Sequence, residues 1–208
     1  RDGMVRAFSY DLALYWTEVR DEIVPYRGGR FYFSAGAVRR RGAELGVHVV
    51  TAPGLELDAA LTGNDHRYTR YAVDSVHYGR PGAVADYGGN RVVGVPDAHG
   101  SAALRWLPAR QLVAMEVGMQ WVDAFWADDA NQVRVPGYAL WNAEVGLRPM
   151  RLGRGLTLRG SLQVENLADR AYVASAFLNP DVVAGEPVAF EPGLPRHVIL
   201  SVSLGWGR

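Results

Sequence analysis

Residues Gln163–Tyr172 read QVENLADRAY, an alternating segment that runs directly into the sequence Asn-Leu-x-Asp-Arg-x-Tyr. A long loop follows, and the chain then ends on a second alternating segment, Val198–Trp206. Alternation of apolar and polar residues with period two is typical of a β-strand whose two faces meet different environments. The C-terminal part is therefore predicted to be two long strands joined by a loop.

The same period-two pattern recurs along the rest of the chain. In the first alternating segment, one face carries only large apolar side chains: Phe8, Tyr10, Leu12, Leu14 and Trp16. Similar segments cover residues 43–49, 55–62, 101–106, 113–121, 139–148, 156–165 and 198–206. No helical 3.6-residue pattern competes with them. We therefore predict an all-β chain of about eight antiparallel strands.

The predicted connections alternate in length. Short links are expected at residues 52–54, 107–110 and 149–155, and longer links at residues 21–29, 71–96, 127–136 and 167–195. Outer-membrane barrels have short turns on the periplasmic side and long loops outside the cell. The pattern of links matches that asymmetry.

The amino-acid composition argues against several classes of partner, site and membrane segment. The chain has 208 residues with 22 basic and 22 acidic side chains, so its zero net charge does not indicate a nucleic-acid partner. The absence of cysteine excludes disulfides and thiolate metal sites. No run of about 18 uncharged apolar residues exists, which excludes a transmembrane helix but not a barrel, whose strands need only about 9–11 residues. No signal-peptide pattern opens the chain at Arg1, so we expect either a mature N-terminus or a piece of a longer protein.

Alternation alone also fits a soluble β-sandwich, whose apolar face points inward. Three features favour a membrane barrel: the length of the strands, the glycines and charges on the polar face, and the positions of the tryptophans. We expect two aromatic girdles, one near the long loops and one near the short turns, made by Trp16, Trp121 and Trp141 and by Trp106 and Trp206 respectively.

Several segments resemble one family, the TonB-dependent outer-membrane receptors, and lie in the order found in that family. They are the "N-L-F-D-x-x-Y" box at 166–172, "P-G-x-P-R" at 192–196, a closing aromatic strand, "N-A-G…G-v-E-L" at 34–45, "G-x-x-l-p-x-v-P" at 89–96 and "v-P-G-Y" at 135–138. The chain departs from these patterns at Ser34, at Ala168 and after Trp206, where Gly207 and Arg208 follow. Nothing in the chain resembles the plug domain or the TonB box of the family.

The resemblance implies a transmembrane antiparallel β-barrel of the 22-stranded type, of which residues 1–208 form about eight C-terminal strands. It further implies a receptor in the outer membrane of a Gram-negative bacterium. Such a receptor takes up a scarce ligand, most often a ferric siderophore and otherwise haem or cobalamin, with energy from the TonB complex. The expected partners are that ligand, TonB through the missing N-terminal part, and the lipid bilayer, without a protein-bound cofactor.

Two sets of site residues follow. Aromatic and arginine side chains on the long loops suit an anionic or macrocyclic ligand, and the candidates are Arg70, Tyr71, His77, Tyr78, Tyr87, Trp126 and Asn131. Charges on the inner face are candidates for contact with a plug, although they could equally pair with one another across strands: Asp58, Arg105, Glu116, Glu144, Arg148, Arg159 and Glu165.

Other chemistries are less well supported. Asp128 and Asp129 are expected to be only solvated loop carboxylates, and the five histidines lack the spacing of metal ligands. His99 and Ser101 share a strand face but lie about 7 Å apart, so we predict no catalytic pair and no enzyme. The alternative function is a self-contained eight-stranded barrel with a structural, adhesive or lipid-modifying role. The inward charges would then have to pair in a dry interior.

Overall fold

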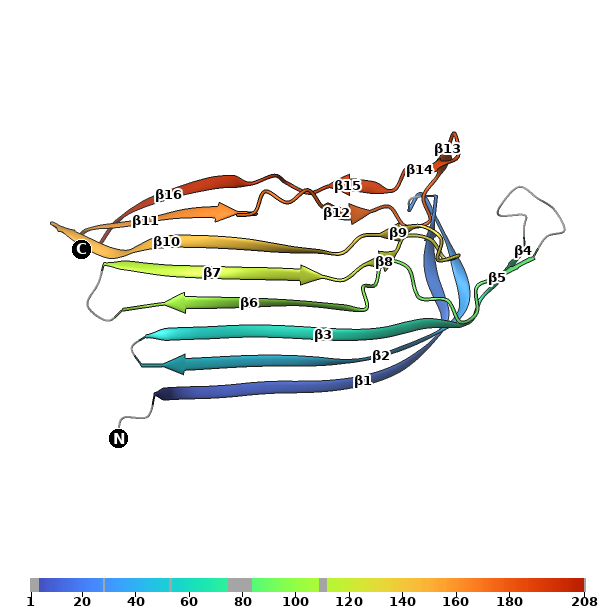
Figure 1. Ribbon diagram of the computed structural model, residues 1–208, viewed down its shortest axis with the longest axis horizontal. Helices are drawn as coiled ribbons and strands as arrows, with labels where there is room; N and C mark the ends of the chain where they lie inside the picture. The colour runs from blue at the N-terminus through green and yellow to red at the C-terminus, as the bar shows by residue number, and fades with distance from the viewer. Residues whose placement is uncertain (1–3, 28, 53, 75–83, 109–111, 208) are drawn as a thin grey trace.

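The computed structural model describes residues 4–27, 29–52, 54–74, 84–108 and 112–207. Eight long strands form one antiparallel sheet in the order β1-β2-β3-β6-β7-β10-β11-β16 (Figure 1). Their bounds are β1 Val5–Tyr26, β2 Phe31–Thr51, β3 Leu55–Arg70, β6 Ala98–Trp106, β7 Val113–Val122, β10 Tyr138–Gly153, β11 Leu156–Glu165 and β16 His197–Trp206. The all-β, antiparallel prediction is confirmed. Among the described residues, no helix is long and apolar enough to span a membrane.

The register of the sheet turns the sequence alternation into two faces. One cross-strand row holds only apolar residues, namely Phe8, Val49, Leu57, Leu104 and Val117. The row one residue further along the strands is polar or small, namely Ser9, His48, Asp58, Ala103 and Gly118. The apolar side chains of the first face are open to solvent in the isolated chain, with Leu12 63% and Leu200 73% exposed. This is the pattern of a barrel wall whose outer face is covered by lipid.

Eight shorter strands lie in the connections at one end of the sheet (Figure 1). They pair as β4 (Ala72–Asp74) with β5 (Val84–Asp86), β8 (Phe125–Trp126) with β9 (Arg134–Val135), β12 (Val173–Ala176) with β15 (Phe190–Pro192), and β13 (Val182–Val183) with β14 (Glu186–Pro187). The long links predicted at residues 127–136 and 167–195 are therefore confirmed, as is the link at 71–96 except for residues 75–83, which lie outside the described residues.

Two predicted links were wrong in extent. The segment 21–29 is mostly strand, because β1 continues to Tyr26 and pairs with β2 as far as Phe31. Asp21 has a φ of 56°, but the register continues unchanged across it, with Arg20 opposite Ala37 and Glu22 opposite Ala35. The segment 149–155 is likewise strand up to Gly153, with the reversal at Arg154 and Gly155, which have φ angles of 51° and 78°. A register shift between Leu147 and Met150 interrupts the period-two alternation, so the sequence pattern does not show that the strand continues.

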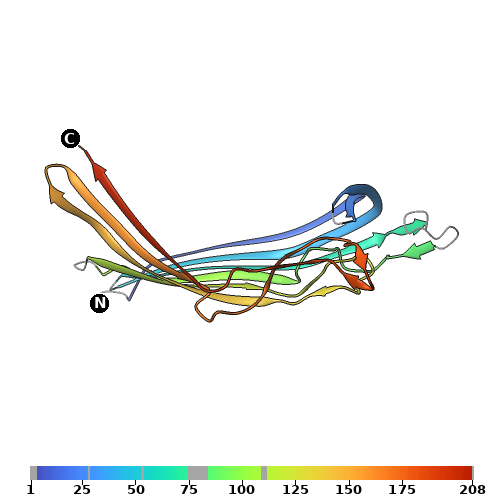
Figure 2. The ribbon, with the colours of Figure 1, turned by 90° about the horizontal axis from the view of Figure 1, so that it is seen from above.

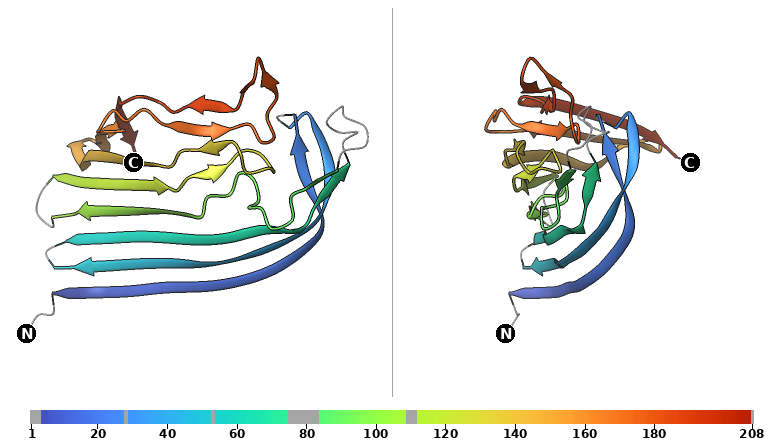
Figure 3. Two further views of the ribbon diagram at one scale, coloured as in Figure 1. Left: turned by 45° about the vertical axis from the view of Figure 1, so that its right-hand side comes forward. Right: turned by 90° about the vertical axis from the view of Figure 1, so that its right-hand side faces the viewer.

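The extension of β1 also explains the position of Trp16. Trp121 and Trp141 lie near the loop end of β7 and β10, and Trp106 and Trp206 end β6 and β16. Trp16 is in mid-strand because β1 and β2 project beyond their neighbours, bending over at the loop end (Figures 1 and 3).

The sheet is a curved section of wall with two free edges. β1 and β16 lie at opposite edges and do not pair with each other in the described part of the chain, and the views from above and from the side show an open trough (Figures 2 and 3). A single sheet has no second layer to pack against, so few side chains are buried. The main buried cluster lies instead at the loop end and consists of Val24, Val38, Tyr68, Tyr71, Val73 and Val92.

Candidate functional site

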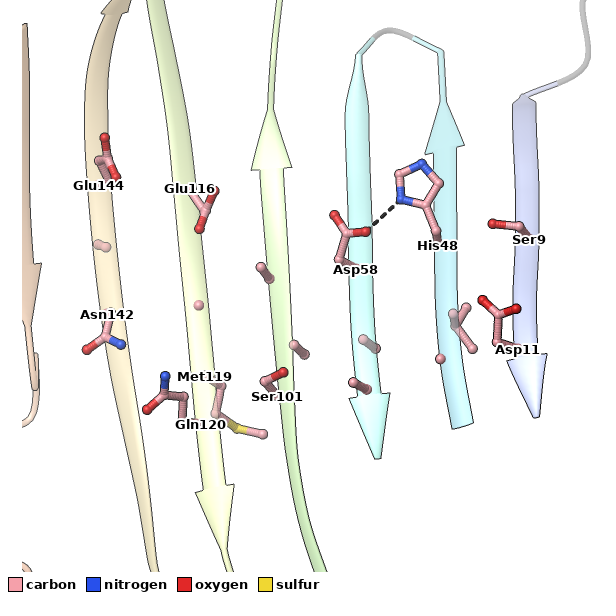
Figure 4. Close-up of a pocket in the computed structure, with 18 of the residues that line it drawn as sticks. Ser9, Asp11, His48, Asp58, Ser101, Glu116, Met119, Gln120, Asn142 and Glu144 are labelled. Atoms are coloured by element: carbon pink, nitrogen blue, oxygen red, sulfur yellow. Dashed lines mark hydrogen bonds and ion pairs between the residues drawn. The ribbon is translucent and has the colours of Figure 1, made fainter. Parts of the chain in front are cut away.

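The inner face of the sheet is hollowed near its centre. A cavity of about 480 Å³ is lined by side chains from β1, β2, β3, β6, β7 and β10 (Figure 4), and by Gln163 of β11. Its polar lining includes Ser9, Asp11, His48, Asp58, Ser101, Glu116, Gln120, Asn142, Glu144 and Gln163. These residues share one face because each alternates with a lipid-facing neighbour on its strand.

One arginine holds several of the wall carboxylates together. Arg105 Nε donates to Glu116 Oε2 at 2.8 Å, and its Nη1 donates to Glu56 Oε2 at 3.3 Å. Asp58 Oδ2 lies 3.8 Å from the same Nη1, and Asp58 Oδ1 lies 2.7 Å from His48 Nδ1. Glu56, Arg105 and Glu116 are direct cross-strand partners, so the ion pairs follow from the register.

The wall retains an excess of negative charge. Asp11 and Glu144 line the hollow, and no hydrogen bond or ion pair of either side chain is present within the described parts of the chain. The lining thus has four carboxylates, Asp11, Asp58, Glu116 and Glu144, against the single imidazole of His48. Such a surface is suited to a partner that carries cationic or amide donors.

The sequence-based lumen candidates lie in four different places on the wall. Asp58, Glu116 and Glu144 meet at the hollow, with Arg105 beside them. Glu165 lies at the loop end of β11, where its Oε2 is 2.9 Å from His197 Nε2. Arg159 lines a second hollow of about 680 Å³ at the opposite end of β11 and β16. Arg148 lies on β10, where its backbone N–H donates to Leu112.

A polar group higher on the inner wall was missed from the sequence. The Tyr15 hydroxyl donates to Asn64 Oδ1 at 2.6 Å and lies 2.9 Å from His66 Nε2. The Tyr15 hydroxyl end lies against Gly42, where an added Cβ would be 2.4 Å from its Oη. Because Tyr15 alternates with lipid-facing Leu14 and Trp16, its inward placement was visible in the pattern, but its partners on β3 were not.

The loop candidates are placed differently from one another. Tyr71 is only 1% exposed, and its hydroxyl donates to Asp129 Oδ2 at 2.8 Å, so its side chain belongs to the buried loop cluster. Tyr87 packs edge-on against Tyr71 with ring centroids 5.3 Å apart. Trp126 lies under the guanidinium of Arg134, 5.9 Å from the ring centroid.

The remaining loop candidates are Asn131, Arg70, His77 and Tyr78. Asn131 holds neighbouring backbone, since its Oδ1 accepts from Arg91 N and its Nδ2 donates to Arg91 O. Arg70 is exposed at the end of β3. His77 and Tyr78 lie outside the described residues.

The expectation that Asp128 and Asp129 are merely solvated was wrong. Asp129 is 1% exposed and accepts hydrogen bonds from the Tyr68 hydroxyl, the Tyr71 hydroxyl and Asn179 Nδ2. Burial raises the pKa of Asp129 above its ordinary value, although the three donors oppose that shift. Asp128 Oδ1 accepts from the backbone N–H groups of Gln132 and Val133. In the described residues, no group of three or more histidine or acidic side chains could hold a metal ion.

Comparison with known proteins places this geometry in a family. A family model described as "TonB dependent receptor-like, beta-barrel" matches residues 2–167. The ferrioxamine receptor of Yersinia enterocolitica is 30% identical over 175 residues, which cover 81% of this chain but only 22% of that protein. The chain therefore spans about a fifth of the length of this curated relative.

Solved structures share the fold at low sequence identity. The siderophore receptor PiuA from Acinetobacter baumannii superposes with a TM-score of 0.70 at 21% identity, covering 94% of this chain and 26% of that one. The ferric yersiniabactin uptake receptor FyuA from Yersinia pestis gives 0.67 at 18% identity, covering 95% and 27%. The family model covers most of the residues that build the lipid-facing and polar faces of the sheet. The chain thus belongs to the TonB-dependent receptor-like β-barrel family.

Proposed function

We propose that residues 1–208 are the C-terminal eight strands of a larger receptor barrel that takes up a ferric siderophore across the outer membrane with energy from TonB. The observation that carries the proposal is an open, eight-stranded wall with a lipid-type outer face and an acidic inner face, in a chain of this family. The chain covers about a quarter of the receptors with which it superposes, which agrees with eight strands of a barrel of the 22-stranded type.

The free edges favour a piece of a larger barrel over a self-contained one. Unpaired backbone groups on β1 and β16 would be costly in lipid, where no water satisfies them. Further strands of the same protein would pair with both edges.

The inner wall is proposed to contact a plug inside the barrel. Asp11 and Glu144 have no cationic partner within the described residues, whereas Glu56 and Glu116 share Arg105. A plug surface with arginine, lysine or amide groups would neutralise this excess. Arg148, Arg159 and Glu165 would contact it nearer to the two ends of the barrel.

The loop candidates are proposed to face the siderophore. Trp126, with Arg134 over its ring, and the exposed Arg70 at the end of β3 offer aromatic and cationic side chains to it. Tyr71, Tyr87 and Asn131 support the loops through the contacts described above. His77 and Tyr78 stay sequence-based candidates for the same role.

Uptake by the full-length receptor tests the proposal. The full-length gene is expressed in a Gram-negative strain that lacks its own siderophore receptors, with and without a functional TonB. Radioactive iron is supplied as ferrioxamine, ferric citrate or ferric yersiniabactin, with haem and cobalamin as the alternative cargoes. TonB-dependent accumulation of one iron chelate supports the function. Uptake of haem or cobalamin alone would assign that compound as the cargo in place of a ferric siderophore. The absence of any TonB-dependent uptake would refute the proposal.

A charge reversal tests the plug contact separately. Glu144→Lys is expected to lower TonB-dependent uptake while the receptor still assembles in the outer membrane. Glu186→Lys in β14 is the matched control, since Glu186 is exposed in a loop hairpin. Equal uptake by both variants would argue against a plug contact at Glu144.

A further inference from the structure

Arginine is concentrated at the turn end of the last strands, which is the end of the sheet that bears the short turns. The hairpin of β10 and β11 has four arginines and no acidic residue between positions 145 and 164, and positions 198–207 of the chain have no acidic residue. β10 pairs with β7 only as far as Leu147 opposite Val113 and then continues to Gly153, so the hairpin projects past β7 (Figure 1). This end of the wall is therefore cationic, in contrast to the acidic hollow at its centre.

The second hollow, of about 680 Å³, lies on the inner face at this end. We call it the turn-end hollow and define it by six of the residues that line it: Arg151, Thr157, Arg159, Ser203, Gly205 and Trp206. Trp206 Nε1 donates a hydrogen bond to the carbonyl oxygen of Arg154 at 3.1 Å. The N–H of Gly207 donates to the carbonyl oxygen of Gly155, also at 3.1 Å. These bonds fix the end of β16 to the hairpin turn, and the two curve together away from the earlier strands (Figure 2).

The two arginines of the turn-end hollow have no counter-charge on the wall. Thr157 is the cross-strand partner of Arg151, and Arg159 follows two residues later, so the two arginines are diagonal neighbours about 7–8 Å apart. Both residues are exposed, and neither side chain makes a hydrogen bond or ion pair with any residue that the structure describes. Two like charges at this distance repel each other. A carboxylate between them would offset the repulsion through charge-assisted hydrogen bonds.

The turn-end hollow also has room for a further segment of chain. An added Cβ at Gly205 would meet only the carbonyl oxygen of Thr157 among the described atoms, at 3.9 Å. An added Cβ at Gly207 would meet no described atom within 4 Å. Packing within the described part of the chain therefore does not require glycine at either position. The hollow offers open backbone and two guanidinium groups to a segment that enters it from the lumen.

The direction of β16 indicates which segment lies there. β16 runs towards the turn end and pairs along one edge only, with β11. Closed outer-membrane barrels have an even number of antiparallel strands, so the first strand of the complete barrel would pair with β16 and begin beside Trp206. The residues that lead into that first strand would then lie next to the turn-end hollow. The chain covers only 22% of its ferrioxamine-receptor relative, so a receptor of that length has ample further chain to supply them.

We propose that the turn-end hollow holds the segment that leads into the first strand of the complete barrel, through a carboxylate of that segment bound between Arg151 and Arg159. The inference rests on the proposed function, because it requires that residues 1–208 belong to a larger barrel. It narrows the role of Arg159 from a general plug contact to a contact with one segment. An ion pair at this point ties the first strand to the last and so fixes the seam at which the barrel closes.

Photo-cross-linking in the full-length receptor tests the proposal. The photoreactive residue p-benzoylphenylalanine replaces Ser203, which lines the turn-end hollow, and mass spectrometry identifies the peptide that becomes linked to it. The matched control is the same replacement at Ser101, an exposed serine that lines the central cavity instead. The probe at position 203 is expected to link to an acidic peptide directly before the first barrel strand, and the probe at position 101 is not. A link from position 203 to any other peptide, to a separate protein or to nothing would overturn the proposal.

Charge reversal tests the role of the two arginines. Arg151→Glu with Arg159→Glu is expected to lose most of the cross-link from position 203, because the carboxylate of the segment then meets two like charges. Arg154→Glu is expected to keep the cross-link, since Arg154 is exposed in the same hairpin but does not line the hollow. If the double variant does not reach the outer membrane, Gly205→Leu decides, because a side chain there occupies the hollow without a close contact to the described wall. An unchanged cross-link in the deciding variant would overturn the proposal.

Uptake measured in the same cells separates this inference from the proposed function. If TonB-dependent uptake of the iron chelate persists while the cross-link from position 203 maps elsewhere, the inference fails and the proposed function stands. If the receptor shows no TonB-dependent uptake, the proposed function fails, and the cross-link still decides whether the segment lies in the hollow.

Discussion

Asp129 Oδ1 accepts a hydrogen bond from the Tyr68 hydroxyl at 2.6 Å, although 61 residues separate the two in the chain. Tyr68 ends the inner face of β3, and Asp129 lies between β8 and β9. Asn179 joins them from the loop after β12 and also donates to the carbonyl of Pro25 on β1, at 2.9 Å. One buried carboxylate thus connects the two early strands with two later loops.

Removal of that carboxylate is expected to loosen the loops without unfolding the wall. Asp129→Ala leaves two tyrosine hydroxyls and the Asn179 amide without their acceptor, at a cost of about 2–4 kcal/mol of local stability. Hydrogen exchange should show faster exchange at the amide of Ala127, which donates to Val133 O. Asp86→Ala is the control, because exposed Asp86 accepts from Gly88 N alone among the residues that the structure describes. Unchanged exchange at Ala127 would contradict a structural role for Asp129.

The same carboxyl should make loop stability depend on pH. Since burial raises the pKa of Asp129, the folded loops bind its proton more tightly than the unfolded loops do. The resulting stabilisation is present below the ordinary carboxyl pKa of about 4 and is lost as pH rises through the raised folded pKa. Exchange protection at Ala127, corrected for intrinsic rates, should therefore be higher in acid than at neutral pH. Asp129→Asn should abolish the difference.

Gly42 is predicted to be intolerant of any side chain. An added Cβ would lie 2.3 Å from the Gly63 carbonyl oxygen and 2.4 Å from the Tyr15 hydroxyl oxygen. Gly42→Ala should therefore destabilise the barrel by about 1–3 kcal/mol, as overpacking does. Gly46→Ala on the same strand and face is the control, since its nearest atom would be 3.8 Å away. Denaturant titration of the full-length receptor in lipid vesicles compares the two. Equal midpoints would refute the packing of Tyr15 on Gly42.

Two neighbouring residues on β16 should differ in how strongly a charged substitution destabilises the barrel. Val202 is 66% exposed on the lipid-facing side, and Val202→Arg is expected to cost about 2–4 kcal/mol at mid-membrane depth. Ser201→Arg points into the polar lumen and should cost much less. The fraction of folded receptor recovered in the outer membrane measures both. A greater loss from Ser201→Arg would mean that the two faces are assigned the wrong way round.

The sequence was a good guide wherever one local rule operated. Alternation in β3, β6, β7 and β11 depends only on the two environments of each strand, so strand number and faces could be read residue by residue. The rule failed between Leu147 and Met150, where a register shift displaces the alternation by one position, and beyond Asp21, where β1 continues to Tyr26 through a residue of positive φ. Tyr71 and Asp129 were read as exposed loop residues because burial of a loop arises from contacts with distant loops.

The sequence by itself determined the class of the fold, the lipid-facing and polar faces of each strand, the end of the sheet that bears the long loops, and the family. Each of these depends on the order of residues within one segment. Only the tertiary structure decided which side chains meet: Arg105 with Glu56 and Glu116, Tyr15 with Gly42 and Asn64, and Asp129 with Tyr68 and Asn179. Strand register and loop packing join residues far apart in the chain, and no local pattern of apolar and polar residues encodes those distances.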